Sequence, residues 1–413
     1  MVELLLGTAC YLTLYAASPT GIGSAMQAAA IVLLFGAAAY AVLMNRVKPL
    51  PVSSTELIMY VAGAAYIALG MLREDGALGA LAMSVAFMCA LVFASIISRV
   101  ISLERLLDIG AVVALLCVLT VIAVDHQKAF AALVPRAGTL GADRFMPLGA
   151  TPALVGYTFG AGSILMFRRV VVSSGIWQRV LMAGGTLFGF LFVLAASARS
   201  SLVALVAAAF VALTLEFGVR RVLSLRWVQI AGFSFIVFCI AFADKINSYF
   251  TRMLELESST RGVGTGATGR TELWARGIST LFDSPVAFVF GDGFRSSNSG
   301  VIGFSTESSY ITILLDSGIF LGIAVIMVFM YSPIKALSLV PQQNRHSSSL
   351  VLLAPFLTFL LVESIFSRYL LAIGNPTSLL TLFVLFSVSM RESATKSVQA
   401  PWRGAAIPPS EGK

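Results

Sequence analysis

Charged side chains are scarce in this chain. Asp, Glu, Lys and Arg together make up only 12% of the 413 residues, whereas hydrophobic residues make up 58%. The mean hydropathy of +0.91 lies far outside the range of soluble globular proteins. This composition excludes a soluble domain and predicts a polytopic membrane protein. The apolar runs lack the alternation of a membrane β-barrel, so we expect the membrane spans to be α-helices.

Histidine and cysteine are also scarce, which leaves few ligands for a metal ion. The two histidines, His126 and His346, fall on opposite sides of the predicted membrane and cannot share a zinc ion. The four cysteines all lie in apolar runs, at spacings that match no metal motif, which favours a packing role. We therefore expect neither a metal ion nor a cofactor.

The apolar runs are long enough to cross a membrane. A hydrocarbon core of roughly 30 Å requires about 20 apolar residues per helix. Twelve predicted spans lie near residues 2–17, 24–45, 56–72, 77–98, 106–124, 151–167, 180–198, 200–218, 227–244, 307–331, 348–366 and 372–390. We therefore predict an all-α polytopic integral membrane protein of about twelve transmembrane helices. Nine of the helices lie in residues 1–244 and three in residues 307–390.

The positions of Lys and Arg set the expected orientation. If the N-terminus is cytoplasmic, 16 of the 28 basic residues fall in inner loops or the C-terminal tail. Both termini are therefore expected in the cytoplasm. Residues 245–306 then form a large extracytoplasmic loop, and residues 391–413 form a disordered cytoplasmic tail. The net charge of +8 follows mostly from this topology and requires no nucleic-acid partner.

Three outward segments carry arginines near the predicted membrane edge. The loop after the fifth predicted span holds Arg144. Arg199 lies in the SARSS junction between spans seven and eight, where a guanidinium is costly unless it reaches water or meets an anion. The third segment, residues 245–306, carries Arg252, Arg261, Arg270, Arg276 and Arg295.

Residues 270–284 predict an amphipathic helix on the outer membrane surface. Its apolar face comprises Leu273, Trp274, Gly277, Ile278 and Leu281 at spacings of three and four. Pro285 should end the helix, because the residue before a proline avoids the helical conformation. The N-terminus, with Arg270 and the glycines before it, suits an anion. The alternative is an interfacial helix without a ligand.

Residues 140–325 resemble the O-antigen ligase and polymerase superfamily. The resemblance rests on the Arg199 edge, the Arg270-x-x-x-Trp274 pattern, the Gly291-Asp292-Gly293 turn, and Arg144 followed by Gly149 and Pro152. It continues into span ten as Glu307-Ser308-Ser309-Tyr310, followed by Leu314, Leu315, Asp316, Gly318 and Gly322. Outside this region the agreement with the family is limited to helix number and hydropathy.

The resemblance implies a GT-C-like glycosyltransferase of the bacterial inner membrane. Such enzymes transfer a glycan from undecaprenyl diphosphate to an acceptor on the outer face of the membrane, without a nucleotide sugar. Charge grows on the leaving diphosphate, and the guanidinium fork of arginine binds phosphate oxygens bidentately. The candidate diphosphate-binding residues are Arg199 and Arg270, followed by Arg144, Arg252 and Arg276. A lipid-headgroup patch is the alternative role for the loop arginines.

Glu307 departs from the ligase pattern, which usually has a histidine at this place. A carboxylate there can accept the proton of the acceptor hydroxyl as a general base, or only cap the helix that follows. The loss of the histidine favours a polymerase of O-antigen or exopolysaccharide repeat units over a ligase acting on a lipid or protein acceptor. The implied partners are a carrier-linked glycan donor, a glycan acceptor and membrane lipid. A chain-length regulator and a flippase are further candidates.

Two other classes of protein stay open. A transporter or flippase would also have twelve spans, but it predicts two similar halves and ionisable residues near the middle of the membrane. Asp316 and Glu363 are the plausible acids of that kind, and the two halves of this chain differ in loop length. A structural subunit without chemistry would have no use for arginines at costly membrane-edge positions.

Overall fold

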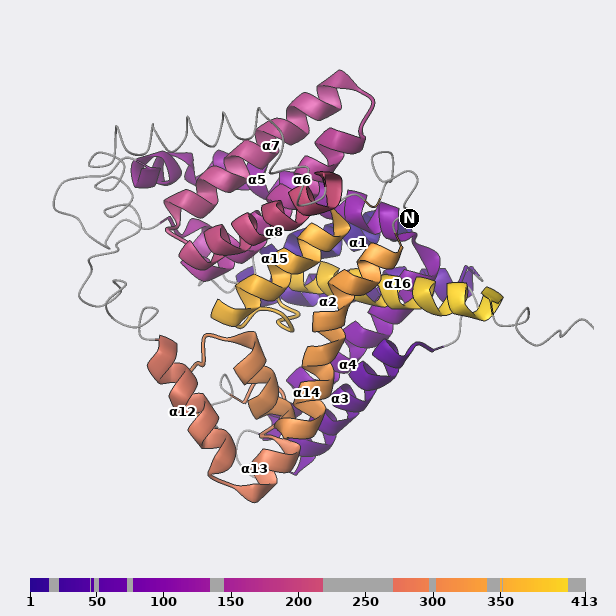
Figure 1. The fold of residues 1–413 in the computed structure, drawn as a ribbon, viewed down its shortest axis with the longest axis vertical. Helices are drawn as coiled ribbons and strands as arrows, with labels where there is room; N and C mark the ends of the chain where they lie inside the picture. The colour runs from indigo at the N-terminus through magenta and orange to yellow at the C-terminus, as the bar shows by residue number, and fades with distance from the viewer. Residues whose placement is uncertain are drawn as a thin grey trace, which may run out of the picture.

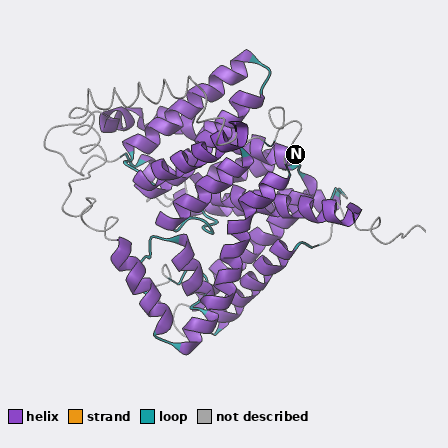
Figure 2. Ribbon diagram, viewed as in Figure 1, coloured by secondary structure: helices purple, strands orange, loops and turns teal. Residues whose placement is uncertain are grey.

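The chain folds into a bundle of α-helices. The computed structural model describes residues 1–14, 22–44, 46–47, 52–72, 77–133, 145–217, 270–296, 302–339, 350 and 352–399. Within these ranges the fold is all-α and contains no strand (Figure 2). The ninth predicted span, residues 227–244, and the first part of the predicted outer loop, residues 245–269, lie outside the described residues.

The helices follow the apolar runs of the sequence. The first half of the chain forms α1 (Val2–Leu12), α2 (Ile22–Leu43), α3 (Ser54–Met71), α4 (Ala77–Val100), α5 (Leu103–Leu133), the 3-10 turn η2 (Pro147–Gly149), α6 (Pro152–Val172), α7 (Ile176–Ala195) and α8 (Arg199–Phe217). The second half forms α12 (Arg270–Phe282), α13 (Pro285–Phe290), α14 (Ser309–Ser338), α15 (Leu353–Phe366) and α16 (Pro376–Gln399).

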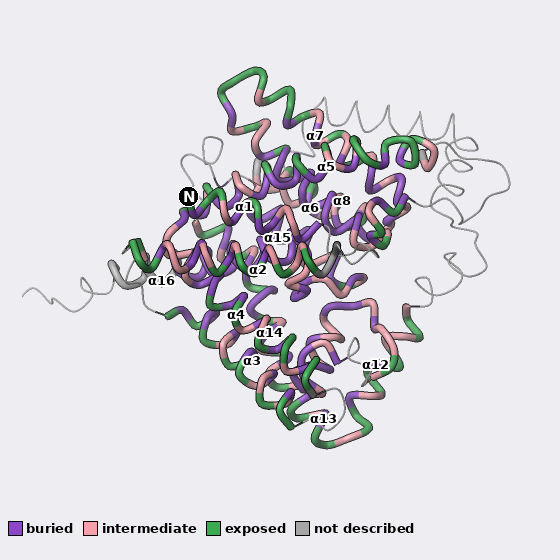
Figure 3. Tube along the Cα trace, turned by 180° about the vertical axis from the view of Figure 1, so that it is seen from behind, coloured by how far each residue is buried: buried purple, intermediate pink, exposed green. Residues whose placement is uncertain are grey.

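The surface of the bundle is that of a membrane protein. Among the described residues, six segments are long and apolar enough to cross a bilayer: Ala25–Leu43, Ser54–Met71, Leu78–Val100, Leu103–Ala132, Ile176–Ala195 and Ser309–Ser338. Large hydrophobic side chains point outward, including Phe35, Phe210 and Phe320, whose exposed fractions are 64%, 63% and 70%. Buried residues gather towards the middle of the bundle and exposed ones on its outside (Figure 3). Such a surface suits lipid rather than water, so the protein is an α-helical membrane protein.

Some helices differ in length from the predicted spans. α1 has 11 residues and α15 has 14, so each is shorter than the roughly 20 residues that a straight crossing needs. α16 continues to Gln399, so the predicted disordered tail does not begin at residue 391. The extension is anchored where Arg391 donates two hydrogen bonds of 2.8 and 2.7 Å to the carboxylate of Glu104.

The helices pack in two groups that share the α14–α16 region. α3, α4 and α14 lie side by side, while α5, α6 and α7 form a second group (Figure 1). α8 packs along α15, and α15 in turn contacts both α14 and α6. α12 and α13 lie on the outside of the bundle next to α14 (Figure 1). This arrangement places the end of α15 between the two groups.

Ion pairs hold one end of the bundle, where α3 and α5 begin and α4, α6 and α16 end. The pairs and their N–O distances are Arg99–Glu56 at 2.8 Å, Arg168–Asp108 at 2.7 Å and Arg391–Glu104 at 2.7 Å. We call this the paired end. The arginines of these pairs are among those that the sequence predicts to be cytoplasmic. The opposite end, where α6, α8 and α14 begin, carries Arg199 and Arg270, which the sequence predicts to be outside.

The Gly291-Asp292-Gly293 turn fits into a break in α14. The helix is interrupted at Gly318, whose φ of 73° is left-handed. The backbone N–H of Asp292 donates to the carbonyl of Leu315 at 2.7 Å, and that of Gly293 donates to the carbonyl of Asp316 at 3.0 Å. In a continuous helix these carbonyls would accept from residues 319 and 320. The break therefore lets the turn dock against the first third of α14.

Close packing at this turn predicts a strong effect of replacing Gly291 with alanine. A Cβ at Gly291 would lie 2.6 Å from the carbonyl carbon of Asp316, on a residue with a φ of 77°. Gly303 has a similar φ of 69° but open space around it, so Gly303→Ala is the matched control. Overpacking typically costs about 1–3 kcal/mol. In thermal unfolding of the purified protein, Gly291→Ala should lower the midpoint clearly more than Gly303→Ala. Equal shifts would show that the turn is not docked.

Candidate functional site

The end of α15 and the turn after it, residues 363–370, are the meeting point of several helices. We call this segment the α15 junction. The hydroxyl of Tyr369 lies 2.8 Å from the hydroxyl of Thr151, which also caps α6. The hydroxyl of Ser200, in the first turn of α8, donates to Oε1 of Glu363 at 3.0 Å. Both contacts are made at the N-terminal end of a helix.

α14 also begins at the junction. The hydroxyl of Ser309, its first residue, donates to the carbonyl of Ser367 at 2.6 Å and accepts from the backbone N–H of Leu370 at 3.1 Å. The N-termini of α6, α8 and α14 therefore converge on one segment. Each helix N-terminus carries about half a positive charge, from backbone N–H groups without a partner in the helix. Their convergence makes the junction a place that favours an anion.

The two leading sequence candidates lie at this junction. Arg199 is the first residue of α8 and precedes Ser200, which holds Glu363. The guanidinium carbon of Arg270 lies 5.9 Å from the ring centre of Phe366, and Arg270 acts electrostatically on Glu363. Trp274, one turn further along α12, lies 5.9 Å from the same ring. The structure therefore brings Arg199 and Arg270 to the same segment, although 71 positions separate them in the chain.

The other sequence candidates are placed differently. Arg276 lies on the exposed face of α12, with its guanidinium carbon 4.3 Å from the ring centre of Phe304. Arg144 and Arg252 lie outside the described residues. α12 itself runs from Arg270 to Phe282, close to the predicted range, and Ser284 and Pro285 begin the next helix instead of continuing it.

Glu307 precedes α14 in a strained backbone conformation. Its φ is 52°, which is uncommon for a residue other than glycine. The N-cap of α14 is Ser308, and Oε1 of Glu307 accepts a hydrogen bond of 3.0 Å from the hydroxyl of Ser305. Glu307 therefore does not cap the helix through its side chain. Of the two roles that the sequence left open, this geometry disfavours the cap. Strained residues of this kind cluster at functional sites.

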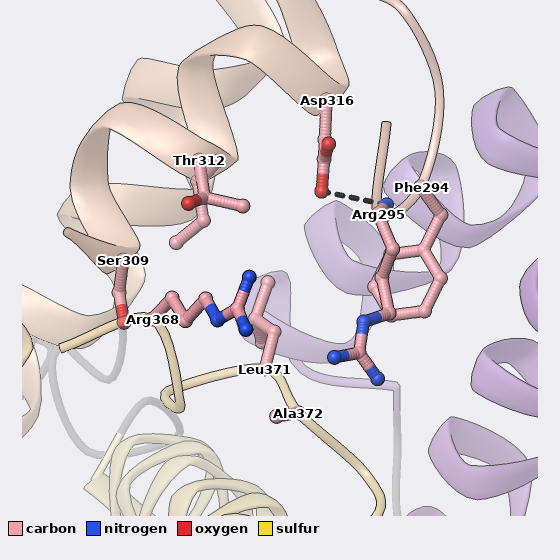
Figure 4. A pocket seen from close by; sticks show the side chains of 9 residues that line it. Phe294, Arg295, Ser309, Thr312, Asp316, Arg368, Leu371 and Ala372 are labelled. Carbon is pink, nitrogen blue, oxygen red and sulfur yellow. Dashed lines mark hydrogen bonds between the residues drawn. The ribbon is translucent and has the colours of Figure 1, made fainter. Parts of the chain in front are cut away.

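Two arginines outside the set of sequence candidates line a small cavity beside the junction. The cavity holds about 20 Å³ and is lined by Phe294, Arg295, Ser309, Thr312, Ile313, Asp316, Arg368, Leu371 and Ala372. Figure 4 shows the side chains of Arg295 and Arg368 reaching into it from opposite sides. Arg295 follows the docked glycine turn, whereas Arg368 belongs to the α15 junction. We call this the arginine cavity.

Asp316 fixes the backbone of Arg295. The carboxylate is buried, with an exposed fraction of 3%. Oδ2 accepts from the backbone N–H of Arg295 at 2.9 Å (Figure 4), and Oδ1 accepts from the backbone N–H and hydroxyl of Ser296 at 3.0 and 2.7 Å. These bonds hold Arg295 at a left-handed φ of 56°. Asp316 therefore positions the arginine, and its carboxylate oxygens are already engaged.

The charged groups around the cavity act on one another. Burial, and then the neighbouring Arg368, lower the pKa of Arg295, while Asp316 and Tyr369 oppose this. Burial also raises the pKa of Tyr369, and Glu307 raises it further. The hydrogen bond with Thr151 and the charges of Arg368 and Arg295 lower the same pKa. Tyr369 therefore interacts electrostatically with both cavity arginines and with the candidate base, Glu307. One pattern in the sequence could have indicated Arg368, because it follows predicted span eleven at a membrane edge, as Arg199 does.

Several buried polar atoms at the junction lack hydrogen-bond partners within the described part of the chain. They include Oε2 of Glu363, the hydroxyl of Ser367 and the indole N–H of Trp274. A buried polar group without a partner costs about 1–3 kcal/mol, and such groups are rare in native structures. The junction is therefore a polar site inside an otherwise apolar bundle.

Neither a protein-family model nor a curated protein sequence matches this chain. The fold and the lipid-facing surface define an α-helical membrane protein with a positively charged polar site at one end of its bundle.

Proposed function

We propose that the protein is a membrane glycosyltransferase that polymerises oligosaccharide repeat units carried on undecaprenyl diphosphate, building O-antigen or exopolysaccharide. One observation carries the proposal. The N-termini of α6, α8 and α14 converge on the α15 junction together with Arg199 and Arg270. This arrangement supports the binding of a highly charged anion at one end of a membrane-embedded bundle. A lipid-linked diphosphate is such an anion.

The diphosphate is bound by Arg199 and Arg270 in this proposal. Bidentate guanidinium–phosphate pairs are charge-assisted and about twice as strong as neutral hydrogen bonds. The apolar surroundings strengthen them further, because electrostatic interactions grow as the local dielectric constant falls. The contribution of the arginines increases during the reaction, since charge grows on the diphosphate as its bond to the sugar breaks.

The proposed reaction is a displacement at the anomeric carbon of the donor glycan. The acceptor hydroxyl oxygen forms a bond to that carbon, and the bond between the carbon and the diphosphate oxygen breaks. The electron pair of the broken bond leaves with the diphosphate. The hydroxyl proton passes to the carboxylate of Glu307, which acts as general base. The chain itself therefore supplies the base and the positive charges.

An apolar groove supports a polyprenyl carrier. It lies between α2 and α4, holds about 440 Å³, and reaches Ile373 in the turn that follows the junction. Its other lining residues include Ile31, Leu34, Leu78, Val85, Cys89 and Phe93. Such a groove suits the isoprenoid tail, because the tail buries only apolar surface. The carrier's head would then lie at the junction and its tail along the bundle.

The proposed topology has twelve spans in the bacterial inner membrane, both termini in the cytoplasm and the junction outside. In a cysteine-free background, Ser279→Cys on the exposed face of α12 should react with an impermeant thiol reagent in intact spheroplasts. Ser102→Cys, exposed in the turn between α4 and α5 at the paired end, should react only after lysis. The reverse labelling pattern would overturn the orientation.

Two other functions are alternatives to polymerisation: a ligase, and a transporter or flippase. A ligase would transfer the finished glycan to a lipid or protein acceptor through the same diphosphate site. A transporter or flippase is favoured by Glu363, whose carboxylate is fully buried within α15 and has one oxygen without a partner in the described residues. Such a carboxylate suits a proton relay as well as a polar binding site.

Deleting the gene and analysing the carrier-linked glycans separates these functions. Loss of a polymerase should leave single repeat units on the carrier, because assembly stops before elongation. Loss of a ligase should instead leave long chains on the carrier. Unchanged glycans combined with altered solute uptake would favour the transporter and contradict the proposal.

A further inference from the structure

We propose that the arginine cavity binds the carboxylate of an acidic sugar, a hexuronic acid residue, in the glycan acceptor. The inference rests on the proposed function for the identity of the acceptor. It adds a second anion site, at Arg295 and Arg368, beside the diphosphate site at Arg199 and Arg270, and it names the class of glycan that the protein elongates.

The shape of the cavity favours an anion between two guanidinium groups. Arg295 and Arg368 come from different parts of the chain and enter the cavity from opposite sides (Figure 4). The apolar part of the lining comprises Phe294, Ile313, Leu371 and Ala372. Two like charges in such surroundings repel each other more strongly than they would in water. Asp316 in the same lining offsets part of this repulsion, but its oxygens already accept hydrogen bonds from residues 295 and 296. A bound anion adds a favourable interaction with both guanidinium groups.

The backbone that carries Arg295 is fixed before the ligand arrives. Three hydrogen bonds from residues 295 and 296 to Asp316 hold the Arg295 backbone in its left-handed conformation. The docked glycine turn fixes the segment against α14 through two further backbone bonds. Phe294 stacks on Phe87, with ring centres 4.6 Å apart, and adds a third anchor. A backbone that is already ordered loses little further conformational entropy when the ligand binds, which increases affinity.

The size of the cavity favours a carboxylate over a diphosphate. A volume of about 20 Å³ exceeds the roughly 10–15 Å³ that one water molecule needs, but not by much. Two carboxylate oxygens in one plane can each meet one guanidinium fork. A diphosphate carries more oxygens in a bulkier tetrahedral arrangement and needs more room than this cavity offers.

The charged groups around Tyr369 favour the glycan acceptor, rather than the donor, as the ligand of the arginine cavity. Arg295, Arg368 and Glu307 all act electrostatically on this one phenol. A sugar anchored by its carboxylate at the two arginines would therefore share the charged surroundings of Tyr369 with the proposed base, Glu307. One of its hydroxyl groups could then transfer its proton to Glu307. The cavity thus positions the acceptor for the displacement.

The test is binding of sodium glucuronate to the purified full-length protein in lipid nanodiscs, measured as the rise in thermal unfolding midpoint with ligand concentration. Glucose and inorganic phosphate are the comparison ligands. We expect glucuronate to stabilise the wild type and glucose to have no effect. Arg295→Gln and Arg368→Gln should each weaken glucuronate binding by about tenfold or more, since each removes a charge-assisted pair. Arg368→Lys should weaken it less, because the charge remains.

Lys128→Gln is the matched control, because it also removes one positive charge. The side chain of Lys128 is 74% exposed and pairs with Asp125. Asp125 also accepts a hydrogen bond from the backbone N–H of Leu148, shortly before α6 begins. It should bind glucuronate as the wild type does. The inference is overturned if glucuronate does not stabilise the wild type, or if the arginine variants retain full binding. Phosphate binding that is lost in the same variants would reassign the cavity to a phosphate group. Because the assay needs no turnover, these results are independent of whether repeat units are polymerised.

Discussion

Replacing Glu307 with glutamine is expected to slow glycan transfer by about 100-fold or more, the range in which general base catalysis contributes. Glutamine keeps the size of the side chain and can still accept the hydrogen bond from Ser305. It cannot accept the acceptor proton at neutral pH. The N-cap of α14 is Ser308, so the substitution removes no capping hydrogen bond. The variant should therefore be folded and abundant but almost inactive.

Glu272→Gln is the control for this substitution. Glu272 is an exposed carboxylate in the first turn of α12, so its replacement makes the same chemical change near another helix N-terminus. Transfer should be measured with purified, lipid-reconstituted protein and a defined carrier-linked repeat unit. Partial recovery of activity in Glu307→His would support the role of a base. A Glu307→Gln rate close to that of wild type would remove Glu307 from the mechanism.

Replacing Arg270 with lysine should lower the transfer rate by about tenfold or more, on the scale of roughly 1.5–3 kcal/mol for a hydrogen bond to a charged group. Lysine preserves the positive charge near Glu363 but loses the planar fork that binds two phosphate oxygens. Arg199→Lys should have a similar effect, because Arg199 begins the neighbouring helix α8. The loss should be seen in the rate at saturating acceptor, with donor concentration varied separately.

Arg105→Lys provides the matched control for the lysine substitutions. Arg105 is 65% exposed and lies near the start of α5, away from the junction. Its conservative replacement should leave transfer unchanged, and protein levels in the membrane should be equal for all three variants. If Arg270→Lys polymerises at the wild-type rate, a bidentate clamp on the diphosphate is excluded for that residue.

The parts of this fold that depend on local sequence could be predicted. Apolar runs indicated the membrane helices because burial in lipid requires an uninterrupted hydrophobic helix. The helix beginning at Arg270 was predicted to end before Pro285, and it ends at Phe282. Its apolar spacing and the proline act within the segment itself. Gly277 and Leu281 of the predicted apolar face are buried, whereas Ile278 is 49% exposed.

The parts that depend on tertiary contacts could not be predicted. A glycine at position 318 inside an apolar run gives no indication that a turn from residues 291–293 docks against it. The same contact determines the position of Arg295. The backbone N–H of Arg295 donates to the carboxylate of Asp316 in α14, 21 positions further along the chain. Arg368 follows an ordinary apolar helix, and only the fold places it opposite Arg295. The convergence of three helix N-termini likewise follows from packing.

The most direct test of the central claim is transfer by the purified protein alone. The protein would be reconstituted in lipid with single repeat units on undecaprenyl diphosphate, and the carrier-linked products would be separated by length. The account predicts a ladder of carrier-linked chains that grows with time and releases undecaprenyl diphosphate. Repeat units that stay single on the carrier, in a preparation that is folded and supplied with both substrates, would contradict it.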